Sequence, residues 1–255
     1  MDRRRIAIIG TGNVATHLIG WLQEAHFTIS SVYTRHPKDH KITPFPIRTS
    51  LDYQGEECEF IVIATKDDAI PEIVTQLANT GQAIILHTSG TVPLAALKKP
   101  AFAGIGILYP LQTLQKGRHM SLENVPFLIE GDKHEVLDQI RALCHEMGAN
   151  FQHATSQERL SYHISAVISA NFTNHLLYFA EKFLDSKELS SDILRPLMEE
   201  TIEKAFEMGA YNSQTGPARR GDEQTIRRHI SLLDDDRQKK LYEMISTSIL
   251  STYEK

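Results

Sequence analysis

The sequence has little of several features that mark particular classes of protein. It contains 2 cysteines in 255 residues, Cys58 and Cys144, which are neither adjacent nor at metal-ligand spacing. This scarcity argues for a reducing compartment and against a disulfide framework or a metal site. Basic residues are outnumbered by acidic ones, 27 to 32, which gives a formal net charge of −5. Without a basic excess, we expect neither nucleic acid nor a membrane surface as a partner.

Long hydrophobic runs are also lacking. The apolar run Ile6–Ile9 follows a basic stretch, but Gly10 ends it, so it is too short for an export signal or a membrane span. We therefore expect a cytoplasmic protein. Hydrophobic residues make up 41% of the chain and charged residues 23%, which is typical of a folded globular protein with a sizeable core.

The first part of the chain alternates short β-rich runs with helical ones, which indicates an α/β fold built on a doubly wound parallel sheet. The expected strands are Arg5–Ile9, Thr28–Tyr33, Phe60–Ala64, Ala83–His87, Gly104–Tyr109 and Pro126–Ile129. The expected helices are Asn13–Glu24, Asp68–Ala78 and His134–Met147. Gly81 and Gly148 lie just past two helix ends, where we expect left-handed caps.

The rest of the chain has a helical pattern with almost no strand signal. The expected helices are Ser156–Phe183, Asp192–Met208, Asp222–Leu233 and Asp235–Thr252, with Ala210–Gly221 as an extended connection. We therefore predict two domains: an α/β domain over residues 1–154 and an all-α domain over residues 155–255.

The first of these helices has no charged residue from His163 to Ala180. A helix that is apolar around most of its circumference needs partners on several sides, which predicts a homodimer formed through the C-terminal helices. At about 100° per residue, His163, Asn171, Asn174 and Tyr178 share one stripe of this helix. The stripe is either a set of hydrogen bonds across a dimer interface or the wall of a cleft.

A glycine turn follows the first expected strand directly and opens the first helix. Its residues are Gly10, Thr11, Gly12, Asn13 and Val14. The first glycine permits a tight turn, and the second lets the backbone approach a pyrophosphate without a Cβ between them. The free N–H groups at the helix start then attract the phosphates. This strand, turn and helix predict a Rossmann-type dinucleotide site.

The end of the second expected strand indicates which nicotinamide cofactor binds. NAD sites place an acidic residue there, whereas NADP sites supply a cation for the 2′-phosphate. This chain has no acid at that point, and we assign Thr34 and Arg35 to the 2′-phosphate, with His36 and Lys38 as further candidates. We therefore predict NADP as the cofactor.

Four further motifs carry a resemblance to a known family: Leu86–Gly90, Tyr109–Thr113, Ala170–His175 and Gly216–Asp222. The chain resembles the NADP-dependent reductases related to pyrroline-5-carboxylate reductase and to the 6-phosphogluconate and hydroxyacid dehydrogenases. It is more closely similar to bacterial Rossmann-like NADP oxidoreductases whose helical C-terminal domain has no assigned function. These proteins combine a dinucleotide-binding domain with a helical dimerisation domain.

The resemblance also implies roles for particular residues. It implies that Ala64, Thr65, Lys66, Asp67 and Asp68 flank the adenosine half of the cofactor. It implies that His87, Thr88 and Ser89 face the nicotinamide. The hydroxyacid dehydrogenases have a lysine four residues before an asparagine, but here Val167 stands four residues before Asn171. A lysine acid–base mechanism is therefore not supported.

The predicted reaction also needs a proton donor and an anchor for the substrate. His87, His163 and Tyr109 are candidate donors because imidazole and phenol groups exchange protons, with Ser89 and Asn171 as further catalytic candidates. Arg219 and Arg220 can hold an anionic substrate, with Asn174 beside them, or can instead form salt bridges between subunits.

These residues together predict an NADP(H)-dependent oxidoreductase that reduces a small oxo or imino acid by hydride transfer. Reduction of a ketopantoate-type substrate is a narrower version of the same hypothesis. A non-catalytic NADP(H) sensor, in which a helical dimer reports whether the cofactor is bound, is the alternative from a different class.

Overall fold

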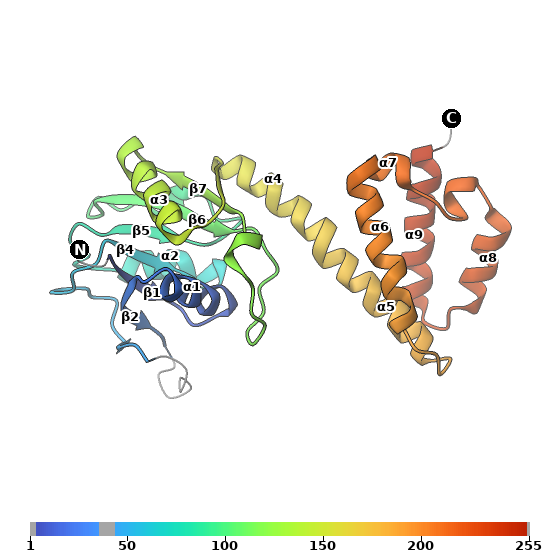
Figure 1. The fold of residues 1–255 in the computed structure, drawn as a ribbon, viewed down its shortest axis with the longest axis horizontal. Helices are drawn as coiled ribbons and strands as arrows, with labels where there is room; N and C mark the ends of the chain where they lie inside the picture. The colour runs from blue at the N-terminus through green and yellow to red at the C-terminus, as the bar shows by residue number, and fades with distance from the viewer. Residues whose placement is uncertain (1–3, 36–43, 254–255) are drawn as a thin grey trace. The chain divides into compact units, whose positions relative to one another are not determined.

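The computed structural model describes residues 4–35 and 44–253 of the chain, which divide into two compact units, Met1–Ala170 and Asn171–Lys255. Figure 1 draws both units as ribbons. Within the described residues, no helix is long and apolar enough to cross a membrane.

The first unit is built on one eight-stranded sheet with the strand order β3-β2-β1-β4-β5-β6-β7-β8. All neighbouring strands are parallel except β6 and β7, which are antiparallel. The strands are β1 (Arg5–Ile9), β2 (Thr28–Tyr33), β3 (Ile47–Arg48), β4 (Phe60–Ile63), β5 (Ile84–His87), β6 (Gly104–Pro110), β7 (Phe127–Gly131) and β8 (Phe151–His153). The predicted α/β class with a Rossmann-type sheet is thus confirmed, with a mostly parallel rather than fully parallel sheet.

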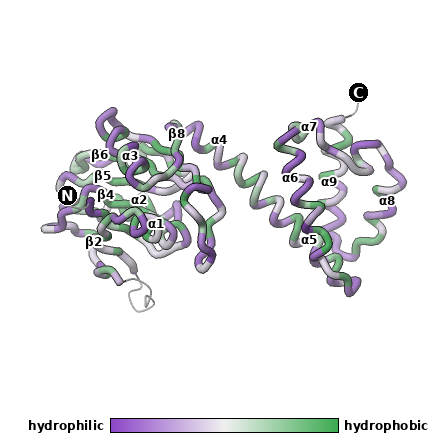
Figure 2. Tube along the Cα trace, in the orientation of Figure 1, coloured by the Kyte–Doolittle hydropathy of each residue, from purple (hydrophilic) through white to green (hydrophobic). Residues whose placement is uncertain are grey.

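Hydrophobic cores cover both faces of this sheet because side chains alternate along each strand. Ile6 and Ile8 of β1 belong to the core that also includes α1 (Asn13–Glu24) and α3 (His134–Met147). Ala7 and Ile9 belong to the opposite core, which includes α2 (Ile70–Gln76). Figure 2 shows the central strands as a hydrophobic layer between these helices. Strands buried on both faces explain the continuous apolar runs in the sequence.

The two glycines predicted as helix caps have the expected backbone conformation. Gly148 is the C-cap of α3, with φ 72°, whereas Gly81, with φ 58°, is not a cap because α2 ends at Gln76 with Leu77 as its C-cap. The helix predicted at Asp68–Ala78 begins as a 3-10 turn over Asp67–Ala69 and continues as α2.

The long helix predicted at Ser156–Phe183 is interrupted, which corrects our expectation. It consists of α4 (Ser156–Ala166), a π-helical segment (Val167–Phe172) and α5 (Thr173–Asp185). A π-helix has a wider turn than an α-helix, so the spacing of about 100° per residue does not hold through this segment. The single stripe that we predicted for His163 and Asn171 assumed that spacing and is not supported.

The second unit is entirely helical. It contains α5, α6 (Arg195–Met208), α7 (Ala210–Ser213), α8 (Glu223–Leu232) and α9 (Asp236–Tyr253). The segment predicted as an extended connection, Ala210–Gly221, instead holds α7 and a 3-10 turn over Ala218–Arg220. The side chain of Asp222 accepts a hydrogen bond from the Thr225 backbone N–H at 3.0 Å and so caps α8 as expected.

The composition of the sequence changes at residue 154, but the division between the two compact units falls later, after Ala170. The strands end with β8, and α4 begins at Ser156, so the sequence pattern follows secondary structure at that point. However, α4 belongs to the first unit because Arg159 is fully buried there and contacts β7. A functional domain boundary at residue 154 stays a prediction.

Candidate functional site

The glycine turn between β1 and α1 has the geometry that its sequence predicts. Gly10 has φ 120°, and a Cβ on it would lie 2.3 Å from the backbone oxygen of Ala64. Only glycine fits this close approach of two loops. Gly12 is the N-cap of α1, has no side-chain cap, and has open space where its Cβ would be. The first N–H groups of α1 therefore face an open region beside Gly12.

A cavity of about 810 Å³ lies at this turn, along the carboxyl ends of the first strands. The structure brings all of the predicted cofactor residues together around it. These are Gly10, Thr11, Gly12, Asn13, Val14, Thr34, Arg35, Ala64, Thr65 and Lys66. Their role in binding stays a prediction. His36 and Lys38, the two further candidates, lie outside the described residues.

Sequence reasoning missed part of this cavity. Asp68, which the resemblance implied, lies on the lining, and one face of α2 with the turn before it adds Ala69, Glu72, Ile73 and Gln76. The spacing of three and four residues between them was a signal that one helix face lines a site. Gln76 Nε2 donates a hydrogen bond to Glu72 Oε1 at 3.0 Å, which gives this wall a polar edge.

The donor set of the cavity fits a phosphorylated dinucleotide. Open N–H groups at the start of α1 suit a diphosphate, and the absent Cβ of Gly12 leaves room for it. Arg35 and Lys66 place two cations on the lining. No carboxylate follows β2 within residues 34–35, where an NAD site holds its ribose.

His87 ends β5 and is fully buried. Its Nδ1 accepts a hydrogen bond from the Ser89 backbone N–H at 3.1 Å, which assigns the ring proton to Nε2. Burial, together with the nearby charge of Arg159, lowers the pKa of His87 to about 4, although the Pro93 carbonyl and Asp67 act in the opposite direction. The imidazole is therefore neutral near pH 7 and is a poor proton donor.

Ser89 organises the loop that follows β5. Its hydroxyl accepts hydrogen bonds from the backbone N–H groups of Thr91 at 3.1 Å and Val92 at 3.0 Å. Thr91 Oγ1 in turn donates to Asp67 Oδ2 at 2.5 Å, which ties this loop to the turn before α2. The Ser89 oxygen is thus occupied by local structure, and its catalytic role stays a prediction.

Tyr109 and His163 form a hydrogen-bonded pair in the first unit. Tyr109 lies near the end of β6 and His163 on α4, with 3.0 Å between the phenol oxygen and Nδ1. The rings meet edge to face, with centroids 6.0 Å apart. Burial raises the pKa of Tyr109, so its phenol is protonated at neutral pH.

Gly90 leaves room for this pair because it has no side chain. A Cβ on Gly90 would lie 2.5 Å from His163 Nδ1 and 2.9 Å from Tyr109 Cζ. The backbone after β5 therefore packs directly against both rings. This contact had no signal in the sequence beyond the glycine itself, because the three residues are far apart in the chain.

The remaining predicted residues belong to the second unit. Asn171 lies in the π-helical segment and Asn174 in α5, and both are exposed. The guanidinium of Arg219 lies 4.2 Å from the ring centre of Tyr253, whereas Arg220 is exposed and helps to lower the pKa of Asp222. The two arginines therefore have different surroundings, and their role as an anion anchor stays a prediction.

A mostly parallel sheet with a glycine turn and a cavity at the carboxyl ends of its strands defines a dinucleotide-binding protein of the Rossmann class. Two family models match the chain: a CoA binding domain over residues 4–113 and a domain of unknown function, DUF2520, over residues 125–249. The chain is 31% identical to the putative NADP oxidoreductase BF3122 from Bacteroides fragilis, with 98% of both chains covered and a TM-score of 0.90. It belongs to the same family as that oxidoreductase.

More distant structures share the fold. A reductive aminase from Aspergillus terreus, solved with NADPH and ethyl levulinate, is 12% identical, with 97% of this chain and 92% of the aminase covered and a TM-score of 0.73. A pyrroline carboxylate reductase from Plasmodium falciparum, solved with NADP bound, is 14% identical, with 98% and 96% covered and a TM-score of 0.54. No match was found among curated proteins.

Proposed function

We propose that this protein reduces a small oxo or imino acid, with NADPH as the hydride donor. The observation that carries the proposal is the Tyr109–His163 pair, a proton-donating group at the same sheet edge as the glycine turn. Ile9, Ile63, His87 and Ile107 are paired in register across β1, β4, β5 and β6. The carboxyl ends of these strands therefore form one edge, where open α/β sheets hold their ligands.

NADPH is the proposed cofactor because of the charges at the end of β2. Arg35 offers a cation for a 2′-phosphate, and Thr34 stands where an NAD site has its carboxylate. The relatives solved with NADPH and NADP have the same fold and support this choice. Bound NADPH would supply the hydride, and the protein supplies placement and the proton.

Tyr109 is the proposed proton donor. When His163 carries its proton on Nδ1, it donates to the phenol oxygen, so the phenol hydrogen is free to point at a substrate. Transfer of that proton to the developing alkoxide or amine leaves a tyrosinate, which the same hydrogen bond from His163 stabilises. His87, being neutral and fully buried, is the weaker candidate.

The proposal also includes a group that anchors the substrate. Arg219 and Arg220 provide cations for a substrate carboxylate, and the small anionic substrates of this proposal include ketopantoate-type acids. Asn171 and Asn174 would add hydrogen bonds to its polar groups. We also propose a homodimer formed through the C-terminal helices, and a cytoplasmic location in line with the cysteine content.

Cofactor binding is the first test. Calorimetric titrations with NADPH, NADH and coenzyme A should show the tightest binding for NADPH. Coenzyme A is included because the N-terminal half matches a CoA binding domain. The matched variants are Gly12→Ala, which has open space for its Cβ but would face the diphosphate, and Gly20→Ala, which also has open space but lies further along α1.

Gly12→Ala should weaken NADPH binding about tenfold or more, which is at least 1.4 kcal/mol, while its thermal stability stays near that of the wild type. Gly20→Ala should leave binding unchanged. A preference for NADH, or equal binding by Gly12→Ala and the wild type, would contradict the cofactor assignment.

Turnover is the second test. Oxo acids and imines should be screened for oxidation of NADPH, followed by absorbance at the nicotinamide band. Tyr109→Phe should keep NADPH binding and lose most of the turnover. Tight NADPH binding with no tested compound able to oxidise the NADPH would instead favour the sensor hypothesis, for which the absence of a lysine at Val167 is the supporting observation.

A further inference from the structure

Arg159 is fully buried in the first unit, at the start of α4. Its Nη1 lies 2.7 Å from Glu130 Oε2, and its Nη2 donates to the backbone oxygen of Val92 at 2.6 Å. A buried guanidinium is costly unless its hydrogen-bonding groups have partners in good geometry. This chain therefore retains a costly group whose contacts hold separate segments together.

The contacts of Arg159 join three segments of the first unit. Glu130 lies on β7, and Val92 lies in the loop that follows β5. Ser156, one turn earlier on α4, donates to Glu130 Oε2 at 2.7 Å and accepts from the Leu94 backbone N–H at 3.0 Å. The first turn of α4 is thereby fixed to both the sheet and this loop.

The same helix face carries His163, four residues after Arg159. Residues at this spacing lie above one another on an α-helix. The loop that Arg159 holds at Val92 begins with Ser89 and Gly90, and Gly90 packs against both rings of the Tyr109–His163 pair. Arg159 thus fixes α4, which carries His163, to the loop that packs against both rings of the pair.

The charge of Arg159 acts on the same cluster. It lowers the pKa of both Tyr109 and His87, whereas Asp67 raises them. Tyr109 is hydrogen-bonded to His163 and is acted on by the charges of Arg159 from α4 and Asp67 from the turn before α2, and Glu130 from β7 pairs with Arg159. Glu130 accepts from Nη1 of this guanidinium, whereas Nη2 donates to the Val92 oxygen.

We infer that Arg159 is a positioning residue for the Tyr109–His163 pair: its bonds to Glu130 and Val92 hold α4 and the Gly90 loop so that the pair stays hydrogen-bonded. The guanidinium itself acts through the pair and does not contact substrate. The catalytic consequence rests on the proposed function, but the structural consequence can be measured without any substrate.

The test compares the wild type with Arg159→Met, Arg159→Lys and the double variant Arg159→Met with Glu130→Met. Arg159→Met alone leaves an unpaired buried carboxylate, which can prevent folding. The double variant removes both charges together and should therefore fold. Arg141→Met is the control, because Arg141 forms an exposed ion pair with Asp138 on α3.

The first measurement is NMR on the full chain, labelled at tyrosine Cζ and at the histidine ring nitrogens. Signals are assigned with Tyr109→Phe and His163→Gln. In the folded double variant, the Tyr109 signal should titrate at higher pH than in the wild type. Adding Tyr109→Phe to the double variant should leave the His163 ring signals unchanged, because the hydrogen bond to Tyr109 is already lost. Wild-type signals for both residues in that variant would overturn the inference.

The second measurement applies once a substrate is known. The double variant should lose about tenfold or more in kcat with little change in the NADPH dissociation constant, because the pair is displaced and the glycine turn is not. Arg159→Lys should recover part of the loss, since an ammonium can pair with Glu130 but cannot match the fork that also reaches Val92. An unchanged kcat would contradict the positioning role. If none of the tested substrates supports NADPH oxidation by the wild type, only the proposed function is contradicted, and the NMR result still decides the inference.

Discussion

His87 shows at the scale of one residue how burial changes chemistry. Its folded pKa of about 4 lies below the ordinary value of 6.5, so the unfolded chain binds more protons between these pH values. Folding is therefore favoured fully above pH 6.5, and the contribution is lost as the pH falls toward 4. The loss amounts to about 3 kcal/mol, at about 1.4 kcal/mol per unit of pKa.

His87→Asn should flatten this acid dependence. The asparagine Oδ1 can accept the Ser89 N–H bond that Nδ1 accepts now, but it takes up no proton. Urea unfolding at several pH values between 7 and 4 measures the effect. His134→Asn serves as the control, because the His134 side chain is 80% exposed and should leave the slope as it is in the wild type.

Gly90 and Gly20 form a second matched pair of positions. Gly90→Ala would push a Cβ into His163 and Tyr109, whereas Gly20→Ala meets nothing within 4 Å and removes a glycine from α1. Displacing a catalytic pair by about 1 Å can cost about 100-fold in turnover, and we expect a loss of that order for Gly90→Ala. Gly20→Ala should keep its activity and gain about 0.5–1 kcal/mol of stability. Equal activity of the two variants would argue against a catalytic role for the pair.

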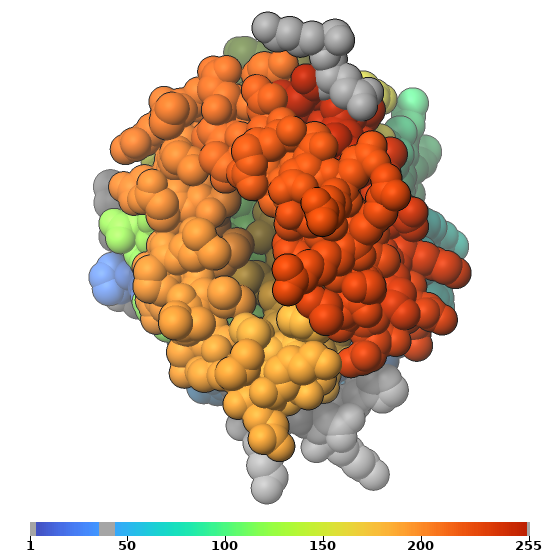
Figure 3. All heavy atoms as spheres, turned by 90° about the vertical axis from the view of Figure 1, so that its right-hand side faces the viewer, coloured from blue at the N-terminus to red at the C-terminus, as the bar shows by residue number. Residues whose placement is uncertain are grey.

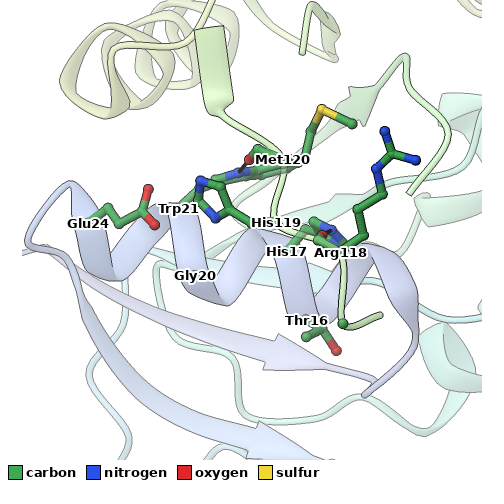
Figure 4. Close-up of a pocket in the computed structure, with 9 residues that line it drawn as sticks. Thr16, His17, Gly20, Trp21, Glu24, Arg118, His119 and Met120 are labelled. Atoms are coloured by element: carbon green, nitrogen blue, oxygen red, sulfur yellow. Dashed lines mark hydrogen bonds between the residues drawn. The ribbon is translucent and has the colours of Figure 1, made fainter. Parts of the chain in front are cut away.

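At the scale of elements, the loop after β6 is fastened to α1. Trp21 Nε1 donates to the backbone oxygen of Met120 at 2.8 Å, and His17 Nε2 lies 2.9 Å from the backbone oxygen of Arg118. Figure 4 shows both rings on α1 turned toward this loop, where they line a small cavity of about 180 Å³. The Lys116 backbone N–H also approaches Asn13 Oδ1, at 3.4 Å, and Asn13 lines the proposed cofactor cavity.

Loosening this loop should weaken cofactor binding. Trp21→Phe keeps an aromatic ring in the core but removes the N–H that holds Met120, which should cost about 1 kcal/mol or slightly more. We expect faster proteolysis within residues 112–122 and NADPH binding that is a few-fold weaker. Trp21→Phe with protection and affinity equal to the wild type would show that the loop does not support the site. Phe127→Leu, which alters the ring packed against Trp21 without touching its N–H bond, controls for core damage.

The strands of the sheet were predictable where they are long and buried on both faces. β1 and β2 have the predicted bounds because their apolar runs carry the signal by themselves. β3, with two residues, and β8, with three, were missed because neither is long enough to show a period. The π-helical segment was missed because helical periodicity assumes the α-helical turn throughout.

The candidate site was predictable only where it is local in sequence. The glycine turn depends on residues that follow one another, so spacing alone locates it. The Tyr109–His163 pair joins a strand to a helix 54 residues later, and nothing in either segment indicates the other. Likewise, the packing of Gly90 against these two rings became evident only from the fold.

At the scale of the whole molecule, the two units differ in how they are stabilised. The first unit has a hydrophobic core on each face of its sheet. In the second unit, the buried residues among those described are Ala218, Ile226 and Ser246. Three small or medium side chains do not form a core of ordinary size, so the helices of this unit leave much of their apolar surface uncovered.

Large apolar side chains are exposed on the second unit. On α6 and the turn before it, Ile193, Leu197 and Phe206 are 79%, 61% and 88% exposed. The face drawn in Figure 3 is hollowed between its orange and red-orange segments, and an apolar cavity of about 580 Å³ lies among α5, α8 and α9. Exposed apolar side chains of this size are common where a partner covers the surface, which supports the proposed homodimer.

Phe206→Glu and Leu197→Glu should therefore separate the dimer. Burying a carboxylate without a partner in an apolar interface costs several kcal/mol, which is enough to shift the association constant by about a thousandfold or more. Sedimentation equilibrium should give twice 28.8 kDa for the wild type and 28.8 kDa for the variants at micromolar concentration. Glu207→Lys, a charge change beside Phe206 on the same helix, should remain dimeric. A wild type that sediments as a monomer at all concentrations would mean that the exposed apolar side chains of α6 are not covered by a second copy of the chain.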